Sequence, residues 1–173
     1  MAVGMVHGRF QPFHAGHLEY ALQASTRCRE LLVGITNPEP GEVPRESTSP
    51  HRHLPEANPY TYLERLLMVR AALGAAGIDL ARVAIVPFPI HDPSRWHHYA
   101  PLGVTHFIRV FSDWEAEKAA RLRAAGSAGV ELPAGAKEVS GSEDRRRLAE
   151  AGDWRGLLPA GVAELIEWPQ KRG

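Results

Sequence analysis

Short apolar runs alternate with longer stretches of helical periodicity along most of this chain of 173 residues. Residues 17–28, 61–76 and 112–125 have the spacing of amphipathic helices. Strands that alternate with helices in this way predict a parallel sheet. The expected fold is therefore α/β, a Rossmann-like doubly wound parallel sheet of about five strands with helices on both faces. The expected strands are residues 3–6, 31–35, 83–88, 105–110 and 129–132.

Two of the expected helices begin with a capping box. Thr61 is followed three residues later by Glu64, and Ser112 is followed by Glu115. In such pairs the hydroxyl and the carboxylate each accept a hydrogen bond from the first turn of the helix. The periodicity of the helix after Thr61 also predicts which side chains face the core, namely Leu63, Leu66 and Leu67.

Size and charge limit the kinds of partner that we expect. The length suits a single domain over residues 1–173. The 20 basic and 20 acidic residues balance, so no overall field attracts nucleic acid or an anionic membrane. No apolar run has the length of a membrane span, and we expect a cytoplasmic protein. The single Cys28 excludes an internal disulfide, and no spacing of histidines predicts zinc. The sequence is also compatible with a homo-oligomer.

One segment interrupts the alternation of strands and helices. Residues 38–59 contain six prolines and no apolar periodicity. The segment also carries Arg45 and Arg52, which could face an anionic ligand. A segment of this composition inside a compact domain predicts a long functional loop or lid.

The segment between the first expected strand and helix predicts a phosphate site. Residues 8–17 read Gly-Arg-Phe-Gln-Pro-Phe-His-Ala-Gly-His. The N-terminus of a helix favours an anion through its unpaired N–H groups and its dipole. His14 and His17 are three residues apart, so both imidazoles can face one ligand and stabilise developing charge as donors. Gly16 between them leaves room for close backbone approach.

This stretch resembles the nucleotidyltransferase superfamily that is marked by a His-x-Gly-His motif. Within it, the opening Gly-Arg-Phe-Gln-Pro-Phe-His is similar to the archaeal type of nicotinamide mononucleotide adenylyltransferase. The resemblance implies that Gly8, Arg9 and Phe10 form the loop beside a triphosphate. It also implies that His14 and His17 bind phosphates and stabilise the transition state, and that neither is a covalent nucleophile.

A second stretch, Val-Ser-Gly-Ser-Glu-Asp-Arg at residues 139–145, resembles the second motif of the same family, which lies at the start of a late helix. Hydroxyl and N–H groups of Ser140, Gly141 and Ser142 can hold triphosphate oxygens. The planar guanidinium of Arg145 pairs well with phosphate, and we expect it to take part in catalysis.

The sequence departs from that family where the acceptor and the base should bind. Thr36 and Asn37 follow the second expected strand, in place of the family's Ser-x-Gln stretch. Residues 109–114 read Arg-Val-Phe-Ser-Asp-Trp, in place of a Gly-Asn-Pro type of sequence. Trp96 corresponds to an aromatic that stacks on the acceptor's ring in the family. The candidate acceptor-binding residues are Thr36, Asn37, Arg45, Arg52 and Trp96.

The expected reaction is attack by a small phosphorylated acceptor on the α-phosphorus of a nucleoside triphosphate, with release of pyrophosphate. The leading pair is ATP and nicotinamide mononucleotide, which gives NAD. The alternative is a cytidylyltransferase that uses CTP and a phosphonate or phosphorylated metabolite. A non-catalytic nucleotide sensor is the alternative from another class. We expect Mg²⁺ on the triphosphate oxygens, with no direct protein ligand to the metal.

Overall fold

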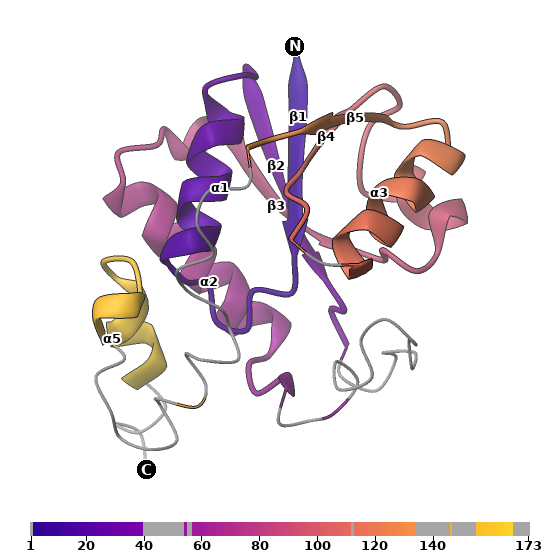
Figure 1. The fold of residues 1–173 in the computed structure, drawn as a ribbon. Coiled ribbons are helices and arrows are strands. Elements are labelled where there is room, and N and C mark those ends of the chain that lie inside the picture. Colours follow the sequence, from indigo (N-terminus) through magenta and orange to yellow (C-terminus); the bar gives the residue numbers. More distant parts are fainter. Residues whose placement is uncertain are drawn as a thin grey trace.

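A computed structural model describes residues 2–39, 54, 57–111, 113–133, 146 and 155–167. Its centre is a five-stranded parallel sheet in the order β3-β2-β1-β4-β5 (Figure 1). The strands are β1 (Val3–Gly8), β2 (Glu30–Thr36), β3 (Val83–Phe88), β4 (Thr105–Ile108) and β5 (Ala128–Glu131). This confirms the predicted fold class.

The helices cover both faces of the sheet. Helices α1 (Ala15–Ser25), α2 (Tyr62–Ala75) and α5 (Val162–Glu167) lie on one side, and α3 (Asp113–Ala124) lies on the other (Figure 1). Short 3-10 helices occur at η3 (Leu80–Arg82), η4 (Pro93–His98) and η5 (Arg155–Leu157). No helix in these described segments has the length and apolar character that a bilayer crossing requires.

Apolar side chains on the two faces of the sheet form two core clusters, because successive side chains in a strand point to opposite faces. Val6 of β1 packs with α1, α2 and α5, whereas Met5 packs with η4 and α3. Phe88 at the end of β3 belongs to the second cluster. Both faces of β1 are buried, which explains the continuous apolar run in its sequence.

Local sequence signals determine the start of α2. The backbone N–H of Glu64 donates to the Thr61 hydroxyl at 3.2 Å, and the Thr61 N–H donates to the Glu64 carboxylate at 2.8 Å. This confirms the first predicted capping box. The second includes Ser112, which lies outside the described residues.

The predicted inner face of α2 is wrong in part. Leu63 is 60% exposed, and Leu66 and Leu67 are only half-buried. The buried face instead carries Arg65, Met68, Val69, Ala72 and Leu73. Leu63 and Leu67 are each two residues away from Arg65, about 200° around the helix, so they lie nearly opposite the buried face.

Two substitutions in α2 test this assignment of faces. Met68→Ala removes a side chain that is 1% exposed, and we expect it to lower the free energy of unfolding by roughly 2–5 kcal/mol. Leu63→Ala changes an exposed position and should cost less than about 0.5 kcal/mol. Urea unfolding followed by circular dichroism measures both. A larger cost for Leu63→Ala than for Met68→Ala would contradict this packing.

Candidate functional site

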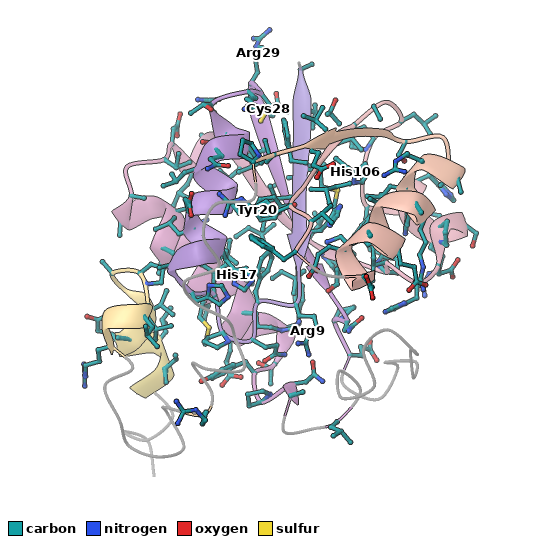
Figure 2. The ribbon with its side chains drawn as sticks, in the orientation of Figure 1. Arg9, His17, Tyr20, Cys28, Arg29 and His106 are labelled. Carbon is teal, nitrogen blue, oxygen red and sulfur yellow. The ribbon has the colours of Figure 1, made fainter. Side chains whose placement is uncertain are left out.

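The loop after β1 and the first turn of α1 bring two histidines together. The rings of His14 and His17 stack with centroids 3.6 Å apart. His14 is the N-cap of α1 and is 6% exposed, and the edges of Phe10 and Phe13 pack around His17. His17 and Arg9 lie at the carboxyl end of the sheet (Figure 2). The helix begins at Ala15, two residues earlier than predicted, because His14 caps it.

The protonation state of His17 follows from its surroundings. Burial and, secondarily, the nearby His14 hold the pKa of His17 well below its usual value. The ring is therefore neutral near pH 7. The backbone N–H of His14 donates to Nδ1 of His17 at 3.4 Å, which places the single ring proton on Nε2. His17 can therefore act as a hydrogen-bond donor that adds no full charge to the site.

Gly8 and Gly16 have no side chain where the rings of Phe10 and His14 lie. A Cβ atom on Gly8 would lie 2.7 Å from the Phe10 ring, and one on Gly16 would lie 3.2 Å from the His14 ring. Phe10 has a φ of 53°, a conformation that costs free energy in residues other than glycine. The loop thus has a specific shape, and Phe10, which is 1% exposed, packs in its interior.

Arg65 of α2 joins the segments that surround this loop, and no motif in the sequence points to it. Its guanidinium donates to the carbonyls of Arg9 and Thr36, both at 2.9 Å. It also donates to the carbonyls of Asn37, Pro38 and Thr61. Burial lowers the pKa of Arg65 to about 10, so the group stays charged at neutral pH. One 1%-exposed side chain therefore binds the ends of β1 and β2 to the start of α2.

Arg9 and Gln11 add further connections between the loop and the residues before α2. The side-chain amide of Gln11 donates to the Tyr60 carbonyl at 3.0 Å, and its oxygen accepts from the Tyr60 N–H at 2.9 Å. Arg9 donates to the Ala57 carbonyl and to Asn58. The loop beside His17 therefore contacts the end of the proline-rich segment.

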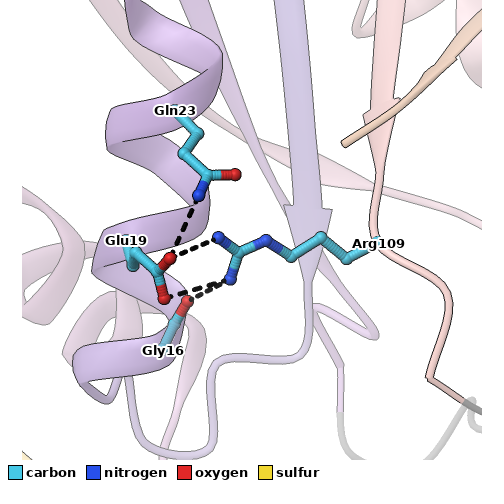
Figure 3. A network of polar contacts seen from close by, with 4 residues as sticks. All are labelled: Gly16, Glu19, Gln23 and Arg109. Atoms are coloured by element: carbon cyan, nitrogen blue, oxygen red, sulfur yellow. Dashed lines mark hydrogen bonds and ion pairs between the residues drawn. The ribbon is translucent and has the colours of Figure 1, made fainter. Parts of the chain in front are cut away.

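Arg109 extends from the end of β4 to the first turn of α1 (Figure 3). Its Nη2 lies 3.0 Å from Oε1 of Glu19, and its Nη1 donates to the carbonyl of Gly16 at 3.5 Å. The hydroxyl of Tyr20 donates to the Phe107 carbonyl next to it. These contacts attach the His14–His17 turn to β4. Residues 109–114 stand where the family's sequence would lie against the nucleotide base. In this structure Arg109 also makes an ion pair with Glu19 of α1.

Two of the predicted acceptor residues, Thr36 and Trp96, are buried. Thr36 is 5% exposed and ends β2, while Asn37 has a φ of 51° and its carbonyl is bound by Arg65. Trp96 of η4 is 6% exposed and packs against Phe88, and its indole N–H donates to the Pro89 carbonyl at 2.8 Å. Trp96 is therefore a core side chain in this structure. Its contact with an acceptor stays a prediction.

Several predicted site residues lie outside the described segments. They are Arg45 and Arg52 of the 38–59 segment and Ser140, Gly141, Ser142 and Arg145 of the second motif. Among the residues that are described, no group of three or more histidine, cysteine, aspartate or glutamate side chains is placed to hold a metal ion.

The fold matches solved nucleotidyltransferases. The chain superposes with a TM-score of 0.73 and 17% identity on a bifunctional NMN adenylyltransferase/ADP ribose pyrophosphatase from Francisella tularensis. The superposition covers 98% of this chain and 50% of the bifunctional protein, so this chain spans about half the length of that protein. A second structure of that protein, with AMP and an Mn ion, gives a TM-score of 0.71. At this identity the likeness concerns the fold alone.

Sequence relatives extend the likeness to the whole chain. It is 47% identical to a phosphonoformate cytidylyltransferase from Streptomyces viridochromogenes, over 95% of this chain and 90% of the relative. It is 33% identical to a nicotinamide-nucleotide adenylyltransferase from Saccharolobus solfataricus, over 96% and 90%. A family model described as cytidylyltransferase-like matches residues 5–85. The chain is therefore a nucleotidyltransferase. It belongs to the cytidylyltransferase-like family.

A pair of substitutions on α2 tests the importance of Arg65. Arg65→Met leaves five carbonyls without their donor and should lower the free energy of unfolding by at least about 3 kcal/mol. Arg65→Lys keeps the charge and up to three donors, so it should retain part of that stability. Arg70→Met, at an exposed position of the same helix, is the control. Urea unfolding would contradict this role if Arg65→Met and Arg70→Met cost the same.

Proposed function

We propose that this enzyme transfers the cytidylyl group of CTP to a small phosphonate and releases pyrophosphate. The observation that supports this is the 47% identity to a phosphonoformate cytidylyltransferase along nearly the full length of both chains. The archaeal nicotinamide-nucleotide adenylyltransferases are 33% identical or less. ATP with nicotinamide mononucleotide, the leading pair from the sequence alone, becomes the second candidate because those relatives also match over the full length.

In the proposed reaction a phosphonate oxygen attacks the α-phosphorus of CTP. A new P–O bond joins acceptor and nucleotide while the bond to the β-phosphate oxygen breaks, and pyrophosphate leaves with that electron pair. Negative charge grows on the phosphoryl oxygens. The N–H of His17 Nε2, the His14 ring and the N-terminus of α1 supply donors to that charge.

Mg²⁺ would reduce charge repulsion along the triphosphate when it is bound. The His14–His17 region offers nitrogen donors to phosphate, so a metal there would be held mainly by phosphate oxygens and water. We also propose that Ser140, Gly141, Ser142 and Arg145 bind the triphosphate, as the family resemblance implies. Arg45 and Arg52, in the proline-rich segment that ends beside Arg9 and Gln11, would face the acceptor.

Substrate choice is decided by comparing two complete substrate pairs. We expect kcat/KM for CTP with phosphonoformate to exceed kcat/KM for ATP with nicotinamide mononucleotide by a factor of roughly 10² or more. A site that hydrogen-bonds one substrate rejects another substrate that leaves those buried polar groups unpaired. Pyrophosphate release measures both, and ³¹P NMR identifies the product. Faster formation of NAD would reverse the order of the two candidates.

Substitutions of His17 test its role in the reaction, with an exposed histidine as the control. His17→Ala should lower kcat by ~10²-fold with little change in the KM for CTP, because a donor aimed at developing charge acts in the transition state. His17→Gln places an amide N–H close to the Nε2 position and should recover part of the loss. His98→Ala, at an exposed histidine of η4, is the control. An unchanged kcat in His17→Ala would remove this residue from the mechanism.

A further inference from the structure

Three nitrogen-bearing side chains meet on the α3 face of the sheet, where β1 and β4 are neighbours. They are His7 at the end of β1, His106 of β4 and Lys118 of α3, and all three are buried. The strand order reverses between β1 and β4, since β2 and β3 lie to one side of β1 and β4 and β5 to the other. In open parallel sheets this reversal is the place where ligands bind, beyond the carboxyl ends of the strands.

The contacts of this cluster are specific. Nζ of Lys118 donates to the carbonyl oxygen of His7 at 3.0 Å, and Nε2 of His7 lies 3.2 Å from Nδ1 of His106. Nδ1 of His7 is buried and has no hydrogen-bond partner among the described residues. Figure 2 shows His106 between the sheet and α3. A buried nitrogen without a partner is uncommon and indicates a binding position.

Charge in the cluster is concentrated on one group. Burial and, secondarily, the Lys118 ammonium lower the pKa of His7 well below its usual value and lower the pKa of His106 to about 4. The two imidazoles are therefore neutral hydrogen-bonding groups. The Lys118 ammonium also contributes to the lowered pKa of His17.

Aromatic side chains fill the neighbouring space. The Phe88 ring stacks on the His7 ring at 5.5 Å between centroids, and the Trp96 ring lies 6.1 Å from that of His106. Trp96 is held by the hydrogen bond to the Pro89 carbonyl. The arrangement of charge and aromatic rings favours a small, highly charged ligand.

We propose that Lys118, supported by His7 and His106, binds the acceptor and selects a compact acceptor that carries a carboxylate beside its phosphonate. The inference rests on the proposed cytidylyl transfer, and it identifies the acceptor side of the same site. Lys118 contacts the backbone of His7, just before the loop that leads to His14 and His17. An anion bound there would lie near the carboxyl end of β1, the edge of the sheet at which His17 also lies (Figure 2).

The test measures the KM for phosphonoformate and for CTP in Lys118 variants of the full chain. Lys118→Met should raise the KM for phosphonoformate roughly 10- to 100-fold and leave the KM for CTP within about twofold, because it removes a charge-assisted contact to the acceptor alone. Lys118→Arg keeps the charge and should retain most of the affinity. Arg121→Met, one turn further along α3, removes a cation that pairs with Glu117 and is the control.

The outcomes separate this inference from the proposed function. Pyrophosphate release by the unmodified enzyme with CTP and phosphonoformate tests the function. If that reaction occurs and Lys118→Met has an unchanged KM for phosphonoformate, the inference is wrong and the function stands. If the unmodified enzyme uses only nicotinamide mononucleotide, both are wrong. Should Lys118→Met fail to fold, His106→Leu must raise the KM for phosphonoformate several-fold, and an unchanged value overturns the inference.

Discussion

The hydrogen bonds of the buried Arg65 guanidinium to five backbone carbonyls hold the site in shape. A guanidinium has five N–H donors in a rigid plane, and here they bind the loop after β1, the end of β2 and the start of α2. Both Phe10 and Asn37 have positive φ angles beside these carbonyls. Backbone conformations of this kind persist where surrounding contacts hold them. The loop after β1 and the end of β2 are therefore fixed by the same residue.

The electrostatics of the site depend on keeping its histidines neutral. Burial lowers the pKa of His7, His17 and His106, so these rings act as hydrogen-bonding groups and do not fill the site with positive charge. Beside His7 and His106 positive charge comes from Lys118, and beside His17 it comes from Arg9 and the N-terminus of α1. Charge that is localised in this way can act on a bound anion at two separate positions. This fits a reaction in which two anionic substrates have to meet.

The sequence predicts the five strands and the main helices because buried strands are continuous apolar runs with short connections. It also predicts the His14–His17 turn, whose residues are adjacent in the chain. The role of Arg65 could not be predicted, since its carbonyl partners come from three separate segments. The same holds for Glu19 and Arg109, and for the cluster of His7, His106 and Lys118. Leu63 was placed inward because leucines lie on more than one face of α2, and the sequence alone does not show that the face with Arg65 is the buried one.

The most direct measurement is a crystal structure of the protein with phosphonoformate and a non-hydrolysable analogue of CTP. We expect the phosphonate and carboxylate groups beyond the carboxyl ends of β1 and β4, within hydrogen-bond distance of Lys118. A phosphonate oxygen should face the α-phosphorus, and the triphosphate should lie against His17 and the N-terminus of α1. Binding of the acceptor away from the β1–β4 junction, or of the triphosphate away from His17, would contradict this arrangement.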